Sequence, residues 1–162
     1  KKNILISYAV LSVLFILGVI FNDFIGIGGI HPDILLIFLL FLAFNEKPVI
    51  VITAAFMFGF LQDVLYPGSL QFWGLSPLFK TLLIYTFLKL LPLIRRLRGF
   101  IFFLSIFTTI FIYYIFYNLL YYSGHVKPFT IFYSYTLPET VYTFMILLVV
   151  TMIFPLYNKS NR

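Results

Sequence analysis

Six long apolar runs, separated by short polar segments, make up most of the chain. Each run is predicted to be a membrane helix, and the six cover residues 3–21, 32–44, 48–63, 76–94, 99–122 and 136–157. The composition supports this interpretation, because the chain is 62% hydrophobic and only 10% charged, which is more apolar than a soluble core of this size requires. No polar stretch is long enough to form a second domain. The sequence therefore predicts an all-α integral membrane protein with one transmembrane domain over residues 1–162.

The basic residues fall almost entirely on one side of the six predicted spans. Eight lie on the side of the two termini, Lys127 lies in a loop on the other side, and Lys80 and Lys89 lie within the fourth span. Cytoplasmic loops are enriched in Lys and Arg, so both termini are expected in the cytoplasm. Basic residues that cluster at helix ends are not a nucleic-acid footprint, and no nucleic-acid partner is predicted. The eight residues are Lys1, Lys2, Lys47, Arg95, Arg96, Arg98, Lys159 and Arg162.

The third and fourth spans form a hairpin that carries polar residues near its turn. Ala55 and Gly59 give the third span a small-residue face for helix packing. Gln62 and Asp63 follow one turn beyond Gly59, and Lys80 lies within the first turn of the fourth span. An acid that ends one hydrophobic helix and a lysine that begins the next require a specific reason to be there, because charges in lipid are costly.

Three acids are predicted on the outer side, at Asp33, Asp63 and Glu139. One interpretation of Asp33 and Glu139 is helix capping, because each follows a proline at a helix start, and Thr136 and Glu139 have the spacing of a capping box. Helix length favours a second interpretation. At about 1.5 Å per residue the second and third spans reach only about 20–24 Å, against a hydrocarbon core of roughly 30 Å. Asp33, Gln62 and Asp63 would then lie below the outer interface in a recessed polar pocket, unless the bilayer thins locally.

Lys80 can reach the same depth as Asp63. We expect it to pair with at least one of Asp33, Asp63 or Glu139, and the alternative is that it snorkels to the outer interface. Lys89, near the cytoplasmic end of the same span, is expected to snorkel. The predicted buried polar cluster consists of Asp33, Gln62, Asp63, Lys80 and Glu139.

Tyrosines repeat every four residues along the outer half of the fifth span, at Tyr113, Tyr117 and Tyr121. An aromatic belt at the membrane interface, or packing inside the bundle, explains part of this stripe. The stripe also extends two turns into the membrane, so these three tyrosines are a candidate docking surface for a partner helix.

Catalytic and metal-binding patterns are missing from the sequence. The chain has no cysteine, and His31 and His125 lie in separate loops without metal-site spacing. No nucleotide-binding or nucleophile motif is present. A non-enzymatic protein with no cofactor and no metal is therefore predicted.

The layout resembles the bacterial rod-shape-determining MreD family. The matching features are a small basic-inside membrane protein, Pro32-Asp33 before leucines in the second span, Gly59 to Asp63 at the end of the third span, and the Pro67-Gly68 turn. The fold of this family is similar to the six-helix substrate-binding subunits of energy-coupling-factor transporters. The resemblance assigns no role to Lys80 or to the tyrosine-rich fifth span, so their roles depend on the physical argument alone.

The resemblance implies a scaffold of the rod complex, or elongasome, in the bacterial cytoplasmic membrane. Its expected partners are membrane lipid and a single-span MreC-like protein. Through that protein it would connect to a RodA-type glycosyltransferase, a class B penicillin-binding protein and MreB filaments, and so help to position peptidoglycan synthesis. The transporter-like fold leaves one alternative open, a subunit that binds a vitamin-type small molecule in the outer pocket.

Overall fold

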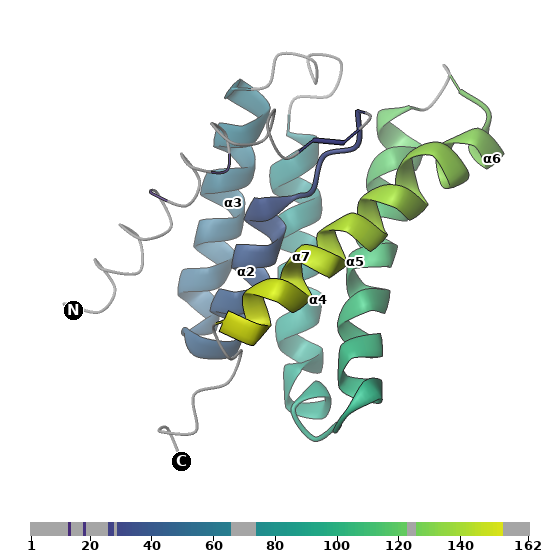
Figure 1. The fold of residues 1–162 in the computed structure, drawn as a ribbon. Helices are drawn as coiled ribbons and strands as arrows, with labels where there is room; N and C mark the ends of the chain where they lie inside the picture. Colours follow the sequence, from purple (N-terminus) through teal and green to yellow (C-terminus); the bar gives the residue numbers. More distant parts are fainter. Residues whose placement is uncertain are drawn as a thin grey trace.

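The computed structural model describes residues 29–65, 74–122 and 126–153, together with residues 13, 18, 26 and 27. Within these residues all regular elements are helices, as expected from the apolar runs (Figure 1). The predicted first span, 3–21, lies outside the described residues except for two positions. The described elements are α2 (Ile34–Asn45), α3 (Pro48–Leu65), α4 (Leu75–Ile94), α5 (Phe100–Tyr121), α6 (Pro128–Ile131), the π-helical turn η2 (Phe132–Thr136) and α7 (Leu137–Ile153).

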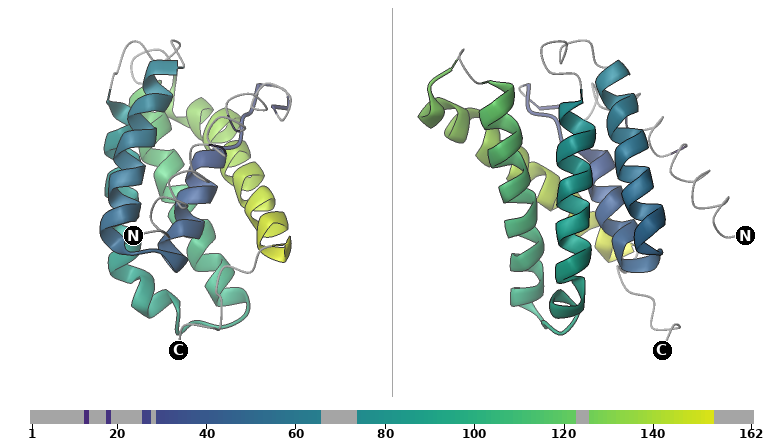
Figure 2. Two further views of the ribbon diagram at one scale, coloured as in Figure 1. Left: turned by 90° about the vertical axis from the view of Figure 1, so that its left-hand side faces the viewer. Right: turned by 180° about the vertical axis from the view of Figure 1, so that it is seen from behind.

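Four described helices are long and apolar enough to cross a membrane. They are Pro48–Leu65, Leu75–Ile94, Phe100–Tyr121 and a bent helix over Pro128–Met152, in which α6, η2 and α7 follow one another without a break. The first three run up and down beside one another, and α7 crosses them at a slant (Figures 1 and 2). The connection between α2 and α3 and that between α4 and α5 lie at the same end of the bundle.

Helix α2 is shorter than these four helices and is largely buried among them. Its twelve residues extend about 18 Å, too short to cross a hydrocarbon core of roughly 30 Å, and eight of the twelve are buried. A helix that is hydrophobic on all faces belongs in an interior, and α2 packs against α3, α4 and α7. Its N-terminus, at Asp33, therefore begins inside the bundle.

The last helix begins earlier than the sequence predicted. The prediction that this helix starts at Thr136, capped by Thr136 and Glu139, is wrong. The chain is already helical from Pro128, and Thr136 ends the turn η2. Pro138 has no N–H to donate and its ring clashes with the carbonyl four residues earlier in a regular helix. The wider turn absorbs this defect, and the N–H of Leu137 bonds to the carbonyl of Phe132. The cap-like residues mark a bend rather than a start.

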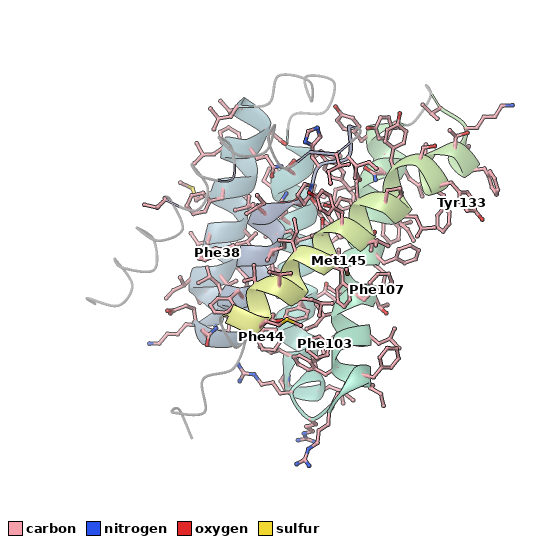
Figure 3. The ribbon with its side chains drawn as sticks, in the orientation of Figure 1. Phe38, Phe44, Phe103, Phe107, Tyr133 and Met145 are labelled. Carbon is pink, nitrogen blue, oxygen red and sulfur yellow. The ribbon has the colours of Figure 1, made fainter. Side chains whose placement is uncertain are left out.

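Aromatic and aliphatic side chains fill the bundle at the C-terminal end of α2. Phe44, labelled in Figure 3, packs edge-on against Phe87 of α4, with 5.6 Å between ring centroids, and at 5.8 Å from Phe102 of α5. Ile106 and Ile110 of α5 are fully buried nearby in the same core. The Arg95 guanidinium donates to the Phe44 carbonyl at 2.7 Å, which supplies a cation to the negative end of the α2 dipole.

Candidate functional site

Lys80 is a fully buried lysine that has three oxygen acceptors for its ammonium group. Its Nζ lies 2.5 Å from Asp33 Oδ2, 2.7 Å from Gln62 Oε1 and 3.1 Å from the Tyr113 hydroxyl. An ammonium has three protons to donate, so the three contacts saturate it. We call Asp33, Gln62, Lys80 and Tyr113 the Lys80 cluster. Lys80 does not extend to the interface, and of the three acids considered from the sequence its partner is Asp33.

Asp33 performs both functions that the sequence offered as alternatives. Its Oδ1 accepts from the N–H of Leu36 at 2.8 Å and so caps α2, while its Oδ2 pairs with Lys80. The Tyr113 hydroxyl also donates to Oδ2 at 3.2 Å. Capping satisfies one of the free N–H groups at the helix start. The same carboxylate thus fixes the end of α2 and neutralises a charge from α4.

The backbone N–H of Asp33 faces two hydroxyls that come from other helices. The Tyr114 hydroxyl accepts at 3.1 Å and Thr143 Oγ1 at 3.2 Å, and these two oxygens lie 2.8 Å apart. Tyr114 belongs to α5 and Thr143 to α7. With Gln62 on α3, the bonds around Asp33 and Lys80 connect five helices. Neither Tyr114 nor Thr143 was identified from the sequence, because isolated hydroxyl residues in apolar runs have no local signal of their partner.

Asp63 has a different task from Asp33. Its Oδ2 accepts from the N–H groups of Gly74, at 2.8 Å, and Ser76, at 3.3 Å, and its side chain is buried. It thereby caps the start of α4 from the neighbouring helix. Gly59 lies one turn earlier, where an added Cβ would meet Pro77 Cα at 2.6 Å. Ala55 is fully buried a further turn away. The backbones of α3 and of the first turn of α4 are therefore in contact at Gly59.

Glu139 lies in a second polar group. Asn118 Nδ2 of α5 donates to Glu139 Oε2 at 2.7 Å and faces Thr136 Oγ1 at 3.4 Å. Asn118 and Thr136 are both buried. The described contacts of Lys80 do not include Glu139, so the acid assigned to the predicted cluster instead holds the bent helix to α5.

The tyrosine stripe of α5 runs along the inside of the bundle from the Lys80 cluster. Tyr113 is 3% exposed, and its ring stacks on Tyr117, which stacks in turn on Tyr121. Tyr117 also packs edge-on against Phe79 of α4. The prediction that Tyr113 docks a partner helix is wrong, because Tyr113 already packs against α4 and α2 inside the bundle. Tyr117 and Tyr121 are half-buried, and their contact with a partner stays a prediction.

The arrangement is suited to holding helices together. The buried cation is neutralised by one carboxylate and its other protons are satisfied, which removes the large cost of an unpaired charge. Among the described residues no group of three or more His, Asp or Glu side chains has the arrangement of a metal site.

A family model described as rod shape-determining protein MreD matches residues 2–160 of the chain. The chain belongs to the MreD family. The resemblance seen around residues 31–80 thus extends over nearly the whole sequence, and membership in the MreD family implies a role in determining rod shape. With four described helices of membrane-spanning length, this MreD-family chain is a multi-pass helical membrane protein. No curated protein and no solved structure matched the sequence significantly.

Proposed function

We propose that this protein is a non-enzymatic membrane scaffold of the bacterial rod complex. The family match over residues 2–160 carries the proposal. The Lys80 cluster supports it physically, because its polar groups bond to one another across α2, α3, α4 and α5, and the Asp33 N–H adds α7 through Thr143. A fixed bundle of this kind presents a constant surface to its partners, which is the property that a scaffold needs.

The expected partner is a single-span MreC-like protein, and the complex helps to position peptidoglycan-synthesis enzymes in the cytoplasmic membrane. Apolar side chains dominate the exposed faces of the four long helices. Binding of a single-span protein would therefore occur within the membrane, where packing and interhelical hydrogen bonds drive association.

The basic loops orient the scaffold. Lys47 lies at one end of the bundle with the Arg95–Arg98 connection, whereas Lys127 lies at the other end. By the positive-inside rule the first end faces the cytoplasm. Cysteines introduced at Arg96 and Lys127, both exposed, should react with an impermeant thiol reagent from the inside and the outside of the cell respectively. Labelling of Arg96→Cys from outside would contradict this orientation.

Copurification tests the function. The full chain, expressed at native level in a rod-shaped host, is extracted in mild detergent and its bound proteins and small molecules are identified by mass spectrometry. We expect a stoichiometric single-span protein with an extracytoplasmic domain. Lys80→Met is the matched disrupted variant, which should lose the partner together with the bundle geometry. A tightly bound small molecule in place of such a protein would contradict the scaffold and favour a transporter subunit.

A further inference from the structure

Lys89 is the one charged side chain on the exposed surface of the four long described helices. Asp63 and Lys80 are buried and Glu139 is held by Asn118, but Lys89 is exposed on α4. Its ammonium lies 5.3 Å from the centre of the Tyr85 ring, and no hydrogen bond or ion pair joins it to a described residue. Among the described residues, only the Tyr85 ring contacts this charge.

The position of the ammonium argues against simple snorkelling to the cytoplasmic interface. Lys89 precedes the end of α4 by five residues, about 7.5 Å along the axis. Side chains lean toward the N-terminus of their helix, and here the ammonium extends back one turn to Tyr85, which lies near the middle of α4. The charge thus points toward the middle of α4 and away from its cytoplasmic end.

Lys89 belongs to a continuous exposed stripe on α4. Leu82, Tyr85, Lys89 and Leu93 recur every three or four residues, and all four are exposed. We call these residues the Lys89 face. Residues with this spacing lie on one side of a helix, so they form a ridge long enough to pack along another transmembrane helix.

We propose that the Lys89 face binds a transmembrane helix of a partner protein that carries an Asp or Glu at the depth of Lys89 and Tyr85. A lipid phosphate lies at the interface, on the opposite side of Lys89 from Tyr85, so only a protein side chain brings an anion to this depth. Intramembrane charges pair with one another because the unpaired state is costly, and the Tyr85 ring adds a cation–π contact. The proposal rests on the proposed scaffold function and names the surface that the scaffold uses.

Photo-crosslinking in intact membranes tests the assignment. Benzoylphenylalanine replaces Tyr85, and the matched control replaces Phe56, an aromatic residue of α3 that is 53% exposed. We expect an adduct from position 85 and none from position 56, and the crosslinked peptide should be a transmembrane segment that contains Asp or Glu. Lys89→Met should lower the yield about tenfold, the effect of about 1.4 kcal/mol, while Lys89→Arg retains it. Because Lys89 is exposed, neither change should shift the thermal unfolding of the protein.

A charge exchange completes the test. Lys89→Glu should abolish the adduct, and replacement of the partner's acid by Lys should restore it. An adduct insensitive to Lys89→Met, an adduct with lipid or with a second copy of this chain, or a crosslinked helix without an acid would overturn the assignment. If a single-span protein still copurifies with the unmodified chain in that case, the scaffold stands and only the surface is wrong. If none copurifies, both proposals fail.

Discussion

The two ends of α2 are held by opposite kinds of contact. At the N-terminal end, Asp33 caps the helix, pairs with Lys80 and accepts from Tyr113. At the C-terminal end, Phe44 packs between aromatic rings of α4 and α5, and Arg95 supplies one hydrogen bond to its carbonyl. Helix α4 contributes to both ends, because Lys80 near its start and Arg95, the residue that caps its end, contact the two ends of α2.

The difference shows how a short helix can be fixed inside a membrane protein. Lipid removes most of the hydrophobic driving force between helices, because acyl chains are as apolar as leucine. Aromatic packing at Phe44 favours close contact but accepts side chains of similar volume. The polar end tolerates no missing partner, because each group left alone is a buried charge or an unsatisfied donor. The polar end therefore specifies the depth and rotation of α2, and the apolar end fills space.

The largest expected effect comes from breaking the ion pair on one side only. Lys80→Met leaves the Asp33 carboxylate without its cation, and removing one member of a buried pair typically costs about 3–5 kcal/mol. Lys80→Met combined with Asp33→Asn should cost less than the single change, because asparagine retains an oxygen for the Leu36 N–H. Thermal unfolding of the purified proteins in detergent measures both.

The matched control uses an acid that does not contact Lys80. Lys80→Met combined with Glu139→Gln should be additive, because Asn118 holds Glu139 independently. Additivity for Asp33→Asn as well would mean that the ion pair does not stabilise the bundle.

A smaller effect is expected where α3 meets α4. Gly59→Ala places a methyl group 2.6 Å from Pro77 Cα, and the backbone of α4 must move away. Overpacking of this kind costs about 1–3 kcal/mol. Thermal unfolding in detergent measures this cost. Gly74→Ala is not a suitable control, because Gly74 has a φ of +94°, which alanine rarely adopts. Ala55→Gly is the appropriate comparison, since it removes volume at the same face. If the Gly59→Ala protein is as stable as the parent, α3 and α4 can move apart at this contact without a cost in stability.

The apolar end should be more tolerant than the polar end. Phe87→Leu removes three carbon atoms beside Phe44 but leaves no charge or polar group without a partner, so it should cost less than Lys80→Met, for which about 3–5 kcal/mol is expected. Unfolding in detergent should therefore shift less for Phe87→Leu than for Lys80→Met. An equal shift would remove the distinction between the two ends of α2.

Much of this architecture follows from the sequence, and the rest depends on helix rotation. The bounds of α3, α4 and α5 agree with the predicted runs within about two residues, because apolar length sets them. Asp33 and Lys80 could be selected because charges inside apolar runs are rare. Which of the three acids pairs with Lys80 could not be derived, since helices that are apolar on every face give no pattern that fixes their rotation.

The contacts of α5 with the last helix were also beyond local reasoning. Tyr114 and Thr143 lie 29 residues apart, and nothing in either apolar run indicates that their hydroxyls meet beside Asp33. The last span was predicted to begin at Thr136, where Thr136 and Glu139 have the spacing of a capping box, but the backbone is helical without a break from Pro128.

The smallest effect is expected from Tyr113→Phe, which separates ring packing from hydrogen bonding at the polar end. The change removes the hydroxyl that accepts from Lys80 and donates to Asp33, but it keeps the stack with Tyr117. Hydrogen bonds between membrane helices are worth about 0.6 kcal/mol on average, so the protein should be destabilised by about 1 kcal/mol. In the Lys80→Met background the same change should cost less, because the ammonium that donates to the hydroxyl is gone. Tyr117→Phe is the control, since Tyr117 shares the stack but lies outside the Lys80 cluster. Equal costs in both backgrounds would mean that the Tyr113 hydroxyl stabilises the bundle independently of Lys80, through its bond to Asp33 Oδ2.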